Sequence, residues 1–236
     1  NYKMISIVTL SYNCSKQLIK TCNSILNQLV PPSEHIIIDN NSTDDTKYKI
    51  DKLSERYKNK GIELIFISEQ DKGISDGFNK GISICKNPII ALLNSGDTYF
   101  ETTIKVVTDN FGNEDEILFG NLQMEGSNKI ILGDSKFRKK IKYFMPRLNH
   151  PALFVKKSVY DRIGSFSLNY MIAMDYDFLL RAHLGGIKFR YINNTLTIME
   201  PDGISNTNKL KAHKETLTIS KNKFICILSL VYSKFI

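Results

Sequence analysis

Three apolar segments, each followed by a stretch with helical spacing, constrain the fold of this chain more than any other feature. They cover residues 4–11, 34–39 and 62–68, and a fourth apolar run covers residues 88–93. Few polar side chains interrupt these runs, which is typical of strands buried on both faces of a sheet. Because parallel strands need a crossover connection, the alternation predicts an α/β domain with a mostly parallel central sheet flanked by helices.

The stretches between these strands carry apolar residues three and four positions apart, a spacing that predicts helices. We expect helices over residues 15–28, 45–57 and 74–85. Beyond residue 100 the pattern is less regular. It predicts helices at 102–111 and 176–183, and strands at 117–123, 130–132, 151–155 and 187–192.

Polar and acidic side chains follow all four strands of the first half. In a parallel sheet, ligands bind beyond the carboxyl ends of the strands, and these ends meet at one edge. Three of the turns at this edge carry the aspartates Asp39, Asp71 and Asp97. The sequence therefore predicts a ligand site at this edge of the sheet.

Asp97 and Asp39 each have a binding interpretation and a structural one. Asp97 follows the small residues Ser95 and Gly96, and a carboxylate there suits Mg²⁺ or Mn²⁺, which are often held by one or two carboxylates plus substrate phosphates. Asp39 closes the second strand, where a carboxylate can accept hydrogen bonds from a base or a ribose. The alternative for both is an aspartate that shapes a turn or caps a helix.

Glycines recur at every fourth residue in the expected helix 74–85 and the turn before it, at Gly73, Gly77 and Gly81. Each glycine inside a helix costs ~1 kcal/mol relative to alanine. Three on one stripe indicate that something packs very close to this backbone. The sequence leaves open whether that is another element of the fold or a ligand.

Two aspartates and one histidine are candidates for the chemistry. Asp175 and Asp177 lie where the helix expected at 176–183 begins, and an aspartate at a helix mouth that faces a cleft is placed to deprotonate a hydroxyl. N-capping is the alternative. His150 directly follows a basic run, where it can bind a metal or a phosphate, although a lone histidine is more often structural.

The positive charge of the chain is concentrated in two late segments. Thirty-two Lys and Arg against 24 Asp and Glu give a net charge of +8. Six basic residues and one acid lie between Asp134 and Arg147, and six lysines and one glutamate lie in 209–236. Such an excess indicates an anionic partner, which could be nucleic acid, an anionic membrane or a phosphorylated substrate.

The cysteines and the hydropathy bear on the compartment. The four cysteines are scattered without a CxxC pair, so we expect neither a disulfide framework nor a zinc site, and a reducing cytosol is the expected environment. No stretch reaches the ~18–20 apolar residues that a membrane-spanning helix needs.

Other function classes fit the residues less well. A nucleotidyltransferase that forms sugar nucleotides would need a glycine-rich basic loop after the first strand, where residues 12–15 read YNCS. A nucleic-acid-binding protein is suggested by charge alone, and acidic strand ends repel phosphate unless a metal intervenes. Neither a GxxxxGK[ST] loop nor a GxGxxG fingerprint is present.

Six motifs, taken in order, resemble the family 2 glycosyltransferases of GT-A fold, especially bacterial enzymes of surface-polysaccharide assembly (O-antigen, capsule or exopolysaccharide). They are SIVTLSYN, IIIDNNSTDDT, EQDKGISDGFNKGI, LLNSGDTYF, NHPALFVKKSVYDRIGSF and MDYDFLLR. The resemblance implies a GT-A domain with a Rossmann-like sheet over residues 1–206. Its nucleotide-sugar half would cover about 1–100 and its acceptor half about 101–206. A basic helical segment, 207–236, would follow.

The resemblance also implies the residues that bind the donor. Thr9, Tyr12 and Asp39 match positions that line the base and the ribose, and Asp71 matches the nucleotide pocket. Asp97 matches the last acid of the DxD motif, which holds a metal on the diphosphate. Because the motif reads NSGD here, only this final acid remains, and one carboxylate must suffice for Mn²⁺ or Mg²⁺.

For catalysis, the resemblance points to Asp175, which matches the general base of the inverting enzymes, with Asp177 secondary. Met174 stands where an acid is common before the base, and an apolar neighbour raises the pKa of a carboxyl group. His150 falls where related enzymes carry a histidine near the acceptor and the diphosphate.

The implied reaction is an inverting transfer from a nucleotide-sugar donor, a UDP-linked hexose or N-acetylhexosamine, to a hydroxyl of a lipid-linked saccharide. Such an enzyme would be cytoplasmic and peripheral at the inner face of the cytoplasmic membrane, and nucleic acid would not be a partner. The basic segments would meet anionic lipid headgroups. Residues 224–232 (FICILSLVY) would lie in the membrane interface, or would instead pack on the core as a C-terminal helix.

Overall fold

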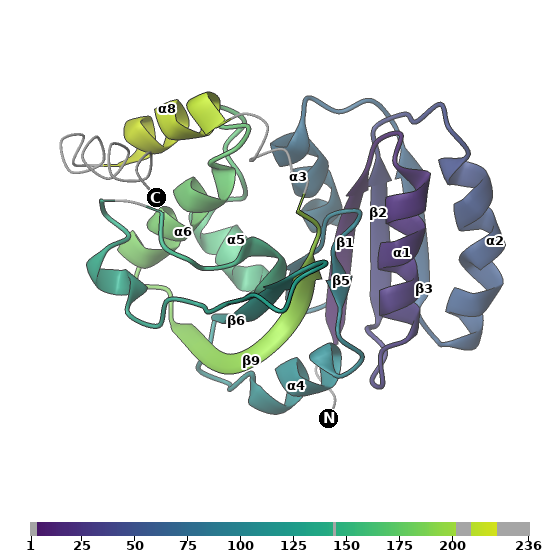
Figure 1. Cartoon of the computed structure of the whole chain (residues 1–236), viewed down its shortest axis with the longest axis horizontal. Helices are drawn as coiled ribbons and strands as arrows, with labels where there is room; N and C mark the ends of the chain where they lie inside the picture. The colour runs from purple at the N-terminus through teal and green to yellow at the C-terminus, as the bar shows by residue number, and fades with distance from the viewer. Residues whose placement is uncertain (1–3, 144, 202–208, 221–236) are drawn as a thin grey trace.

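The computed structural model describes residues 4–143, 145–201 and 209–220, and their strands form one nine-stranded sheet covered by helices on both faces (Figure 1). The strand order is β3-β2-β1-β4-β8-β6-β9-β5, and β7 pairs with β6. The expected α/β architecture is confirmed. The sheet is mixed, since the parallel part seen in the sequence is joined to a second part with several antiparallel pairs.

The first half of the sheet is parallel throughout. It consists of β1 (Ile5–Ser11), β2 (Glu34–Asp39), β3 (Glu63–Ser68) and β4 (Ile89–Leu92). Ser11 is opposite Asp39, and Asp39 is opposite Ser68. The carboxyl ends of three strands are therefore level, and the turns that follow them start from one edge of the sheet.

The second half consists of β5 (Thr98–Tyr99), β6 (Ile117–Met124), β7 (Ile130–Ile131), β8 (Leu153–Lys156) and β9 (Phe189–Met199). Strand β9 extends well beyond residue 192, where the expected strand ends, because its backbone pairs with β6 as far as Met199 and also with β5 at Thr197 and Ile198. It curves across the sheet (Figure 1). The far end of β9 thus reaches the segment that follows Asp97.

Two hydrophobic cores hold the helices against the sheet. The core on one face includes residues of α1 (Ser15–Leu26), α2 (Thr46–Asn59) and α4 (Thr103–Asn110). The core on the other face includes residues of α3 (Ile74–Ile84), α5 (Lys157–Ile163) and α6 (Met174–Leu184). Two short 3₁₀ turns, η1 (Phe137–Lys139) and η2 (His150–Ala152), complete the second half.

The glycine stripe is explained by packing within the fold. A Cβ atom on Gly81 would overlap Cγ1 of Val8 in β1, and one on Gly77 would lie 3.0 Å from Cδ2 of Leu10. Helix α3 therefore packs unusually close to β1. Of the two interpretations of the stripe, close packing of another element accounts for these two glycines.

The C-terminal helix α8 (Lys209–Ile219) lies over α6 (Figure 1). Ile219 packs against the core that includes α6. The expected boundary between residues 206 and 207 and the expected membrane-interface segment 224–232 lie outside the described residues. Among the residues that the structure describes, no helix is long and apolar enough to cross a membrane.

Candidate functional site

Hydrogen bonds connect the turns that follow β1, β2 and β3. The backbone N–H of Asn13 donates to Oγ of Ser42 at 2.8 Å, and the N–H of Thr43 donates to Oδ1 of Asn13 at 2.8 Å. Oδ1 of Asn40 accepts a hydrogen bond from the N–H of Asp71 at 2.8 Å. The three turns thus form one continuous rim above the parallel half of the sheet.

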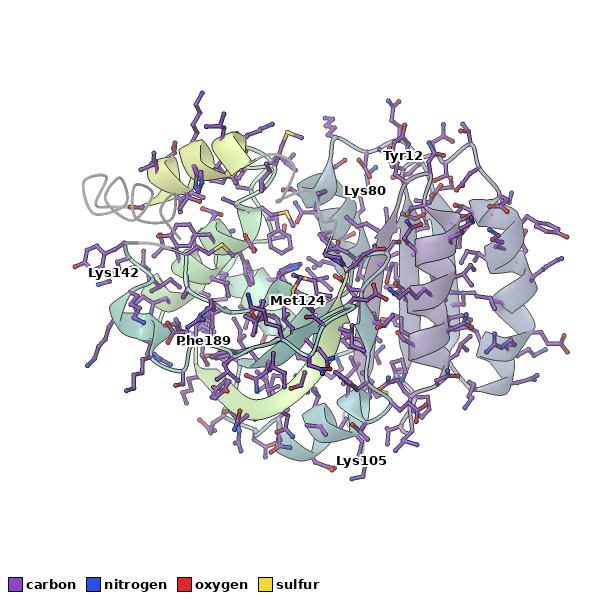
Figure 2. All side chains as sticks on the ribbon, in the orientation of Figure 1. Tyr12, Lys80, Lys105, Met124, Lys142 and Phe189 are labelled. Carbon is purple, nitrogen blue, oxygen red and sulfur yellow. The ribbon has the colours of Figure 1, made fainter. Side chains whose placement is uncertain are left out.

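Tyr12 and Asp39 lie on this rim in different ways. Tyr12 is 61% exposed and stands at the upper edge of the molecule (Figure 2), so its ring is free to stack on a flat ligand such as a base. Asp39 is buried, and its oxygens accept hydrogen bonds from the N–H of Ser42 at 2.8 Å and the hydroxyl of Ser68 at 2.7 Å. Asp39 thus shapes the turn, which agrees with its structural interpretation.

Asp71 organises the turn that leads into α3. Its Oδ1 accepts a hydrogen bond from the N–H of Gly73 at 2.8 Å. Lys80, which lies within α3, donates to the carbonyl oxygen of Gln70 at 2.9 Å and forms an ion pair with Glu69 at 2.7 Å. The turn is therefore held from both sides, and it places the partly buried Asp71 next to the Tyr12 and Asp39 turns.

Thr9, which the resemblance places beside the base and the ribose, has a buried side chain. Its hydroxyl is fully buried and forms a hydrogen bond of 2.9 Å with Nε2 of His35, whose Nδ1 lies 2.7 Å from the hydroxyl of Tyr57 in α2. The side chain thus faces the interior below α1 and α2, away from the rim. Strand alternation indicates this orientation, because Thr9 shares a face with Ile5 and Ile7.

Asp97 follows β4 in a turn that α1 and β1 hold in place. The hydroxyl of Thr21 donates to the carbonyl oxygen of Asp97 at 2.8 Å and accepts from the N–H of Gly96 at 2.9 Å. The hydroxyl of Ser95 donates to the carbonyl oxygen of Leu10 at 2.5 Å. The small residues beside Asp97 therefore anchor the turn to its neighbours.

A second carboxylate, Glu200, lies next to Asp97. The N–H of Glu200 donates to Oδ1 of Asp97 at 3.0 Å, and a Cβ atom on Gly96 would overlap Oε2 of Glu200. Gly96 has φ of 101°, a conformation that favours glycine. The sequence gives no spacing signal for this pair, since the tertiary path of β9 brings Glu200 here.

The electrostatics of this pair suit a cation. Burial raises the pKa of Asp97 to about 7; the hydrogen bond from Glu200 lowers it, and the negative charge of Glu200 raises it further. The ion pair of Lys20 with Glu125, at 2.5 Å, lies close by. Within the described ranges, no group of three or more His, Cys, Asp or Glu side chains forms a metal site. Two carboxylates plus ligand phosphates match the usual coordination of Mg²⁺ and Mn²⁺.

Asp175 lies in the first turn of α6. Its Oδ1 accepts a hydrogen bond from the N–H of Tyr176 at 2.8 Å, and burial raises its pKa to about 6. A carboxyl group with a pKa near the working pH is suited to general-base catalysis. The residue as a whole is neither fully buried nor exposed, although its carboxyl group lies in buried surroundings.

Asp177 has a different surrounding. Its Oδ2 pairs with Nε of Arg181 at 2.9 Å. The same guanidinium donates to the carbonyl oxygens of Ile163 and Ser165, at 2.5 and 2.7 Å. Asp177 therefore orients an arginine that fixes the end of α5, and this structural role sets it apart from Asp175.

The segment before α6 connects Asp175 to the nucleotide-side turns. The hydroxyl of Ser75, in the first turn of α3, donates to the carbonyl oxygen of Tyr170 at 2.8 Å and contacts Sδ of Met174 at 3.0 Å. Met174 directly precedes Asp175, and Ser75 follows the turn that carries Asp71. Candidate base and candidate donor residues are thus joined through α3.

His150, which the resemblance places near the acceptor and the diphosphate, lies among aromatic side chains. Its ring packs against Phe78 and Phe166, with centroids 5.7 and 6.1 Å away. Its Nε2 is buried without a hydrogen-bond partner among the described residues, and the ring lines a small apolar cavity with Leu92 and Phe178. Burial lowers the pKa of His150 to about 4. Nε2 therefore faces apolar surroundings.

Comparison with known sequences agrees with this geometry. The sequence model described as Glycosyl transferase family 2 matches residues 6–173, more than half of the chain. A PGL/p-HBAD biosynthesis glycosyltransferase of Mycobacterium bovis is 25% identical over 209 residues, covering 86% of this chain and 80% of its own. The Escherichia coli UDP-Glc:alpha-D-GlcNAc-diphosphoundecaprenol beta-1,3-glucosyltransferase WfaP is 30% identical over 196 residues. The match covers 81% of this chain and 74% of WfaP.

Two solved structures have the same fold. Staphylococcus aureus TarS 1–349, in complex with UDP-GlcNAc, superposes with a TM-score of 0.72 and 15% identity over 92% of this chain and 65% of its own. The mannosyltransferase PcManGT of Pyrobaculum calidifontis, in complex with GDP-Man and Mn²⁺, superposes with a TM-score of 0.69 and 14% sequence identity. The match covers 93% of this chain and 63% of PcManGT. This chain thus spans slightly less than two thirds of either. Six ordered motifs, the sheet and the matched family model agree: the chain belongs to glycosyl transferase family 2 and has the GT-A fold.

Proposed function

We propose that this glycosyltransferase inverts the configuration of a sugar that it moves from a UDP-linked hexose or N-acetylhexosamine to a hydroxyl of a lipid-linked saccharide. The observation that carries the proposal is Asp175, a carboxylate with a pKa raised to about 6. It stands at the start of α6, and Ser75 connects its neighbour Met174 to the donor-side turn of Asp71. No other described acid combines this pKa with this position.

Asp175 acts as the general base in the proposed reaction. It takes the proton from the acceptor hydroxyl, whose oxygen forms a bond to the anomeric carbon of the donor sugar. The bond from that carbon to the diphosphate breaks on the opposite side, and the nucleoside diphosphate leaves with the electron pair. A single displacement of this kind inverts the anomeric configuration.

A divalent cation fits beside Asp97 in this proposal. Asp97 and Glu200 would hold Mn²⁺ or Mg²⁺, and both side chains would then share their negative charge with the cation. When bound, the metal stabilises the charge that develops on the leaving diphosphate. The Mn²⁺ of the PcManGT complex supports metal use on this fold.

The donor-binding residues of the proposal are those on the rim. Tyr12 offers an exposed ring for the base, while the turns of Asp39 and Asp71 offer polar backbone and side-chain groups beside it. The UDP-Glc named for WfaP and the UDP-GlcNAc of the TarS complex support a UDP-linked sugar.

A lipid-linked acceptor at the inner face of the cytoplasmic membrane fits the basic surface. Phe137 and Ile141 are buried and anchor the segment 134–147, while its six Lys and Arg side chains are exposed. Lys142 points outward at the periphery (Figure 2). Each such residue contributes ~1 kcal/mol of attraction near an anionic membrane, and the acceptor named for WfaP is a diphosphoundecaprenol-linked sugar.

The test is a transfer assay with a panel of nucleotide sugars, with and without Mn²⁺. The acceptor is a synthetic N-acetylglucosamine-diphosphate lipid, and NMR reads the anomeric configuration of the product. We expect transfer from a UDP-sugar with inversion, dependent on the metal. Retention of configuration, or full transfer by the Asp175→Asn variant, contradicts the proposal.

A further inference from the structure

Glu215 of α8 forms an unusual contact with the segment that precedes α6. Its Oε2 accepts hydrogen bonds from the backbone N–H groups of Ile172 and Ala173, at 2.8 and 2.9 Å. Its Oε1 accepts a third, from the N–H of Met171, at 3.2 Å. One carboxylate thus binds three consecutive N–H groups of a segment that lies more than forty residues earlier in the chain.

These hydrogen bonds lie at the N-terminal boundary of α6. The N-cap residue of α6 is Ala173, whose own side chain makes no cap hydrogen bond, while inside the first turn Oδ1 of Asp175 accepts from the N–H of Tyr176. The N–H groups at the start of a helix have no partner within the helix and carry partial positive charge. Glu215 supplies an acceptor for the N–H of Ala173 and of the two residues before it, and it places a negative charge at this end of the helix. Burial acts to raise the pKa of Glu215, but the three hydrogen bonds outweigh it and keep the pKa below its usual value.

The same segment is held on its other side by α3. Ser75 binds the carbonyl oxygen of Tyr170 and contacts Met174. Residues 170–174 are therefore clamped between α8 and α3, and Asp175 is the next residue along the chain. A movement of this segment would shift the backbone that carries Asp175 relative to α3.

We propose that Glu215 is a positioning residue that fixes the start of α6, and with it Asp175, in the geometry that proton abstraction requires. This inference rests on the proposed role of Asp175 as the base. It assigns the C-terminal helix a part in the reaction, in addition to any contact that the basic C-terminal segment makes with a membrane. Glu215 itself does not touch the reacting atoms.

The first test separates kcat from KM. A misplacement of about 1 Å in a catalytic group can cost ~100-fold in rate, so we expect Glu215→Ala to lower kcat by roughly 10–100-fold. The KM for the donor should change by less than about threefold, because the donor-side turns are not altered. Glu215→Gln keeps an acceptor oxygen and should recover part of the lost kcat. Thr218→Ala is the matched control, since Thr218 is exposed and its hydroxyl donates within α8 to the carbonyl oxygen of Lys214.

The second test reads the contact directly by amide hydrogen exchange of a peptide that covers residues 168–178. Glu215→Ala should exchange faster there than the parent protein, and Thr218→Ala should not. Faster exchange with an unchanged kcat overturns the positioning role. Unchanged exchange overturns the contact itself, whatever the rate of transfer.

The variants Asp175→Asn and Glu215→Ala distinguish the proposed base from the proposed positioning residue. If Asp175→Asn transfers sugar at the parent rate, the proposed base is wrong. If Asp175→Asn is inactive while Glu215→Ala retains the parent kcat, the base stands and the positioning role is overturned. A fall in kcat in both variants, with faster exchange only in Glu215→Ala, supports both.

Discussion

The backbone N–H of Glu200 donates a hydrogen bond to Oδ1 of Asp97 at 3.0 Å, although 103 residues separate the two in the chain. The pairing of β9 with β5 creates this contact, because Thr98 is opposite Ile198. Asn94 precedes Asp97 by three residues, and Glu200 places a second carboxylate beside Asp97. The proposed metal site would therefore be shared between the turn after β4 and the end of β9.

We predict that Asp97→Ala abolishes Mn²⁺-dependent binding of a nucleoside diphosphate in calorimetry. Glu200→Gln should weaken the same binding by about tenfold, because it removes one of two carboxylates while keeping a similar shape. Glu101→Gln, which changes an exposed carboxylate just after β5, should bind like the parent. Unchanged metal-dependent affinity in Asp97→Ala would show that the metal, if used, is held elsewhere.

We predict that Asp175→Asn and Asp177→Asn affect different properties. Asp175→Asn should reduce transfer by about 10²–10⁴-fold with donor affinity close to normal and no loss of stability, because a general base touches the acceptor. Asp177→Asn should instead destabilise the protein by roughly 0.5–1 kcal/mol, because it breaks the ion pair with Arg181. Steady-state kinetics and thermal unfolding distinguish them. An active Asp175→Asn with an inactive Asp177→Asn would reverse the assignment.

We predict that kcat increases as the pH rises through about 6 and then levels off. Asp175 must be ionised to accept a proton, and burial raises its pKa to about 6. A pH–rate profile of transfer at saturating donor and acceptor measures this increase in kcat. A profile that is flat between pH 5 and 7 would mean that a group other than Asp175 limits the rate.

We predict that Asp175→Asn stabilises the fold at neutral pH. The pKa of Asp175 is raised from 3.8 to about 6 in the folded protein, so between these values the folded state binds more protons than the unfolded state. Stability is thus lost as the pH rises through this window. Asparagine does not ionise and so avoids this loss. The free energy of unfolding of the variant should exceed that of the parent by on the order of 1–3 kcal/mol at pH 7, but not at pH 3.5. Urea unfolding at both pH values measures the difference.

We predict that the basic segment 134–147 promotes binding to anionic vesicles. Replacing Lys136, Lys139 and Lys142 by glutamine should reduce flotation with phosphatidylglycerol liposomes, since each lysine contributes ~1 kcal/mol near the surface. Lys58→Gln with Lys60→Gln, which changes exposed lysines at the end of α2, is the control. A chain ending at Ser220 tests residues 221–236 separately. Flotation that none of these changes reduces excludes both segments as anchors.

The parallel half of the fold could be predicted from the sequence because its signals are local. Buried parallel strands are short apolar runs, and the helices between them show their spacing within a dozen residues. The expected β2 and the observed Glu34–Asp39 coincide. Helix α5 and strand β5 were not predicted, since two residues of strand carry no pattern and Lys157–Ile163 is a short helix.

The candidate site could be predicted only in part, because only some of its residues have a local signal in the sequence. Asp39, Asp71 and Asp97 follow strand ends, so their common edge follows from the parallel sheet. Strand alternation indicates the face on which Thr9 lies, but not its hydrogen bond to His35, and the surroundings of His150 depend on Phe78 and Phe166. These contacts come from different elements, and no spacing along the chain encodes them.

By itself, the sequence determined the alternation of strands and helices, the acidic strand ends and the ordered motifs, because each depends on residues close together in the chain. Only the tertiary structure decided which carboxylates meet. The curved path of β9 brings Glu200 to Asp97, and the packing of α8 on α6 brings Glu215 to the segment before Asp175. Such contacts arise when buried apolar surface fixes how elements pack, and this packing sets the distances on which the chemistry of a site depends.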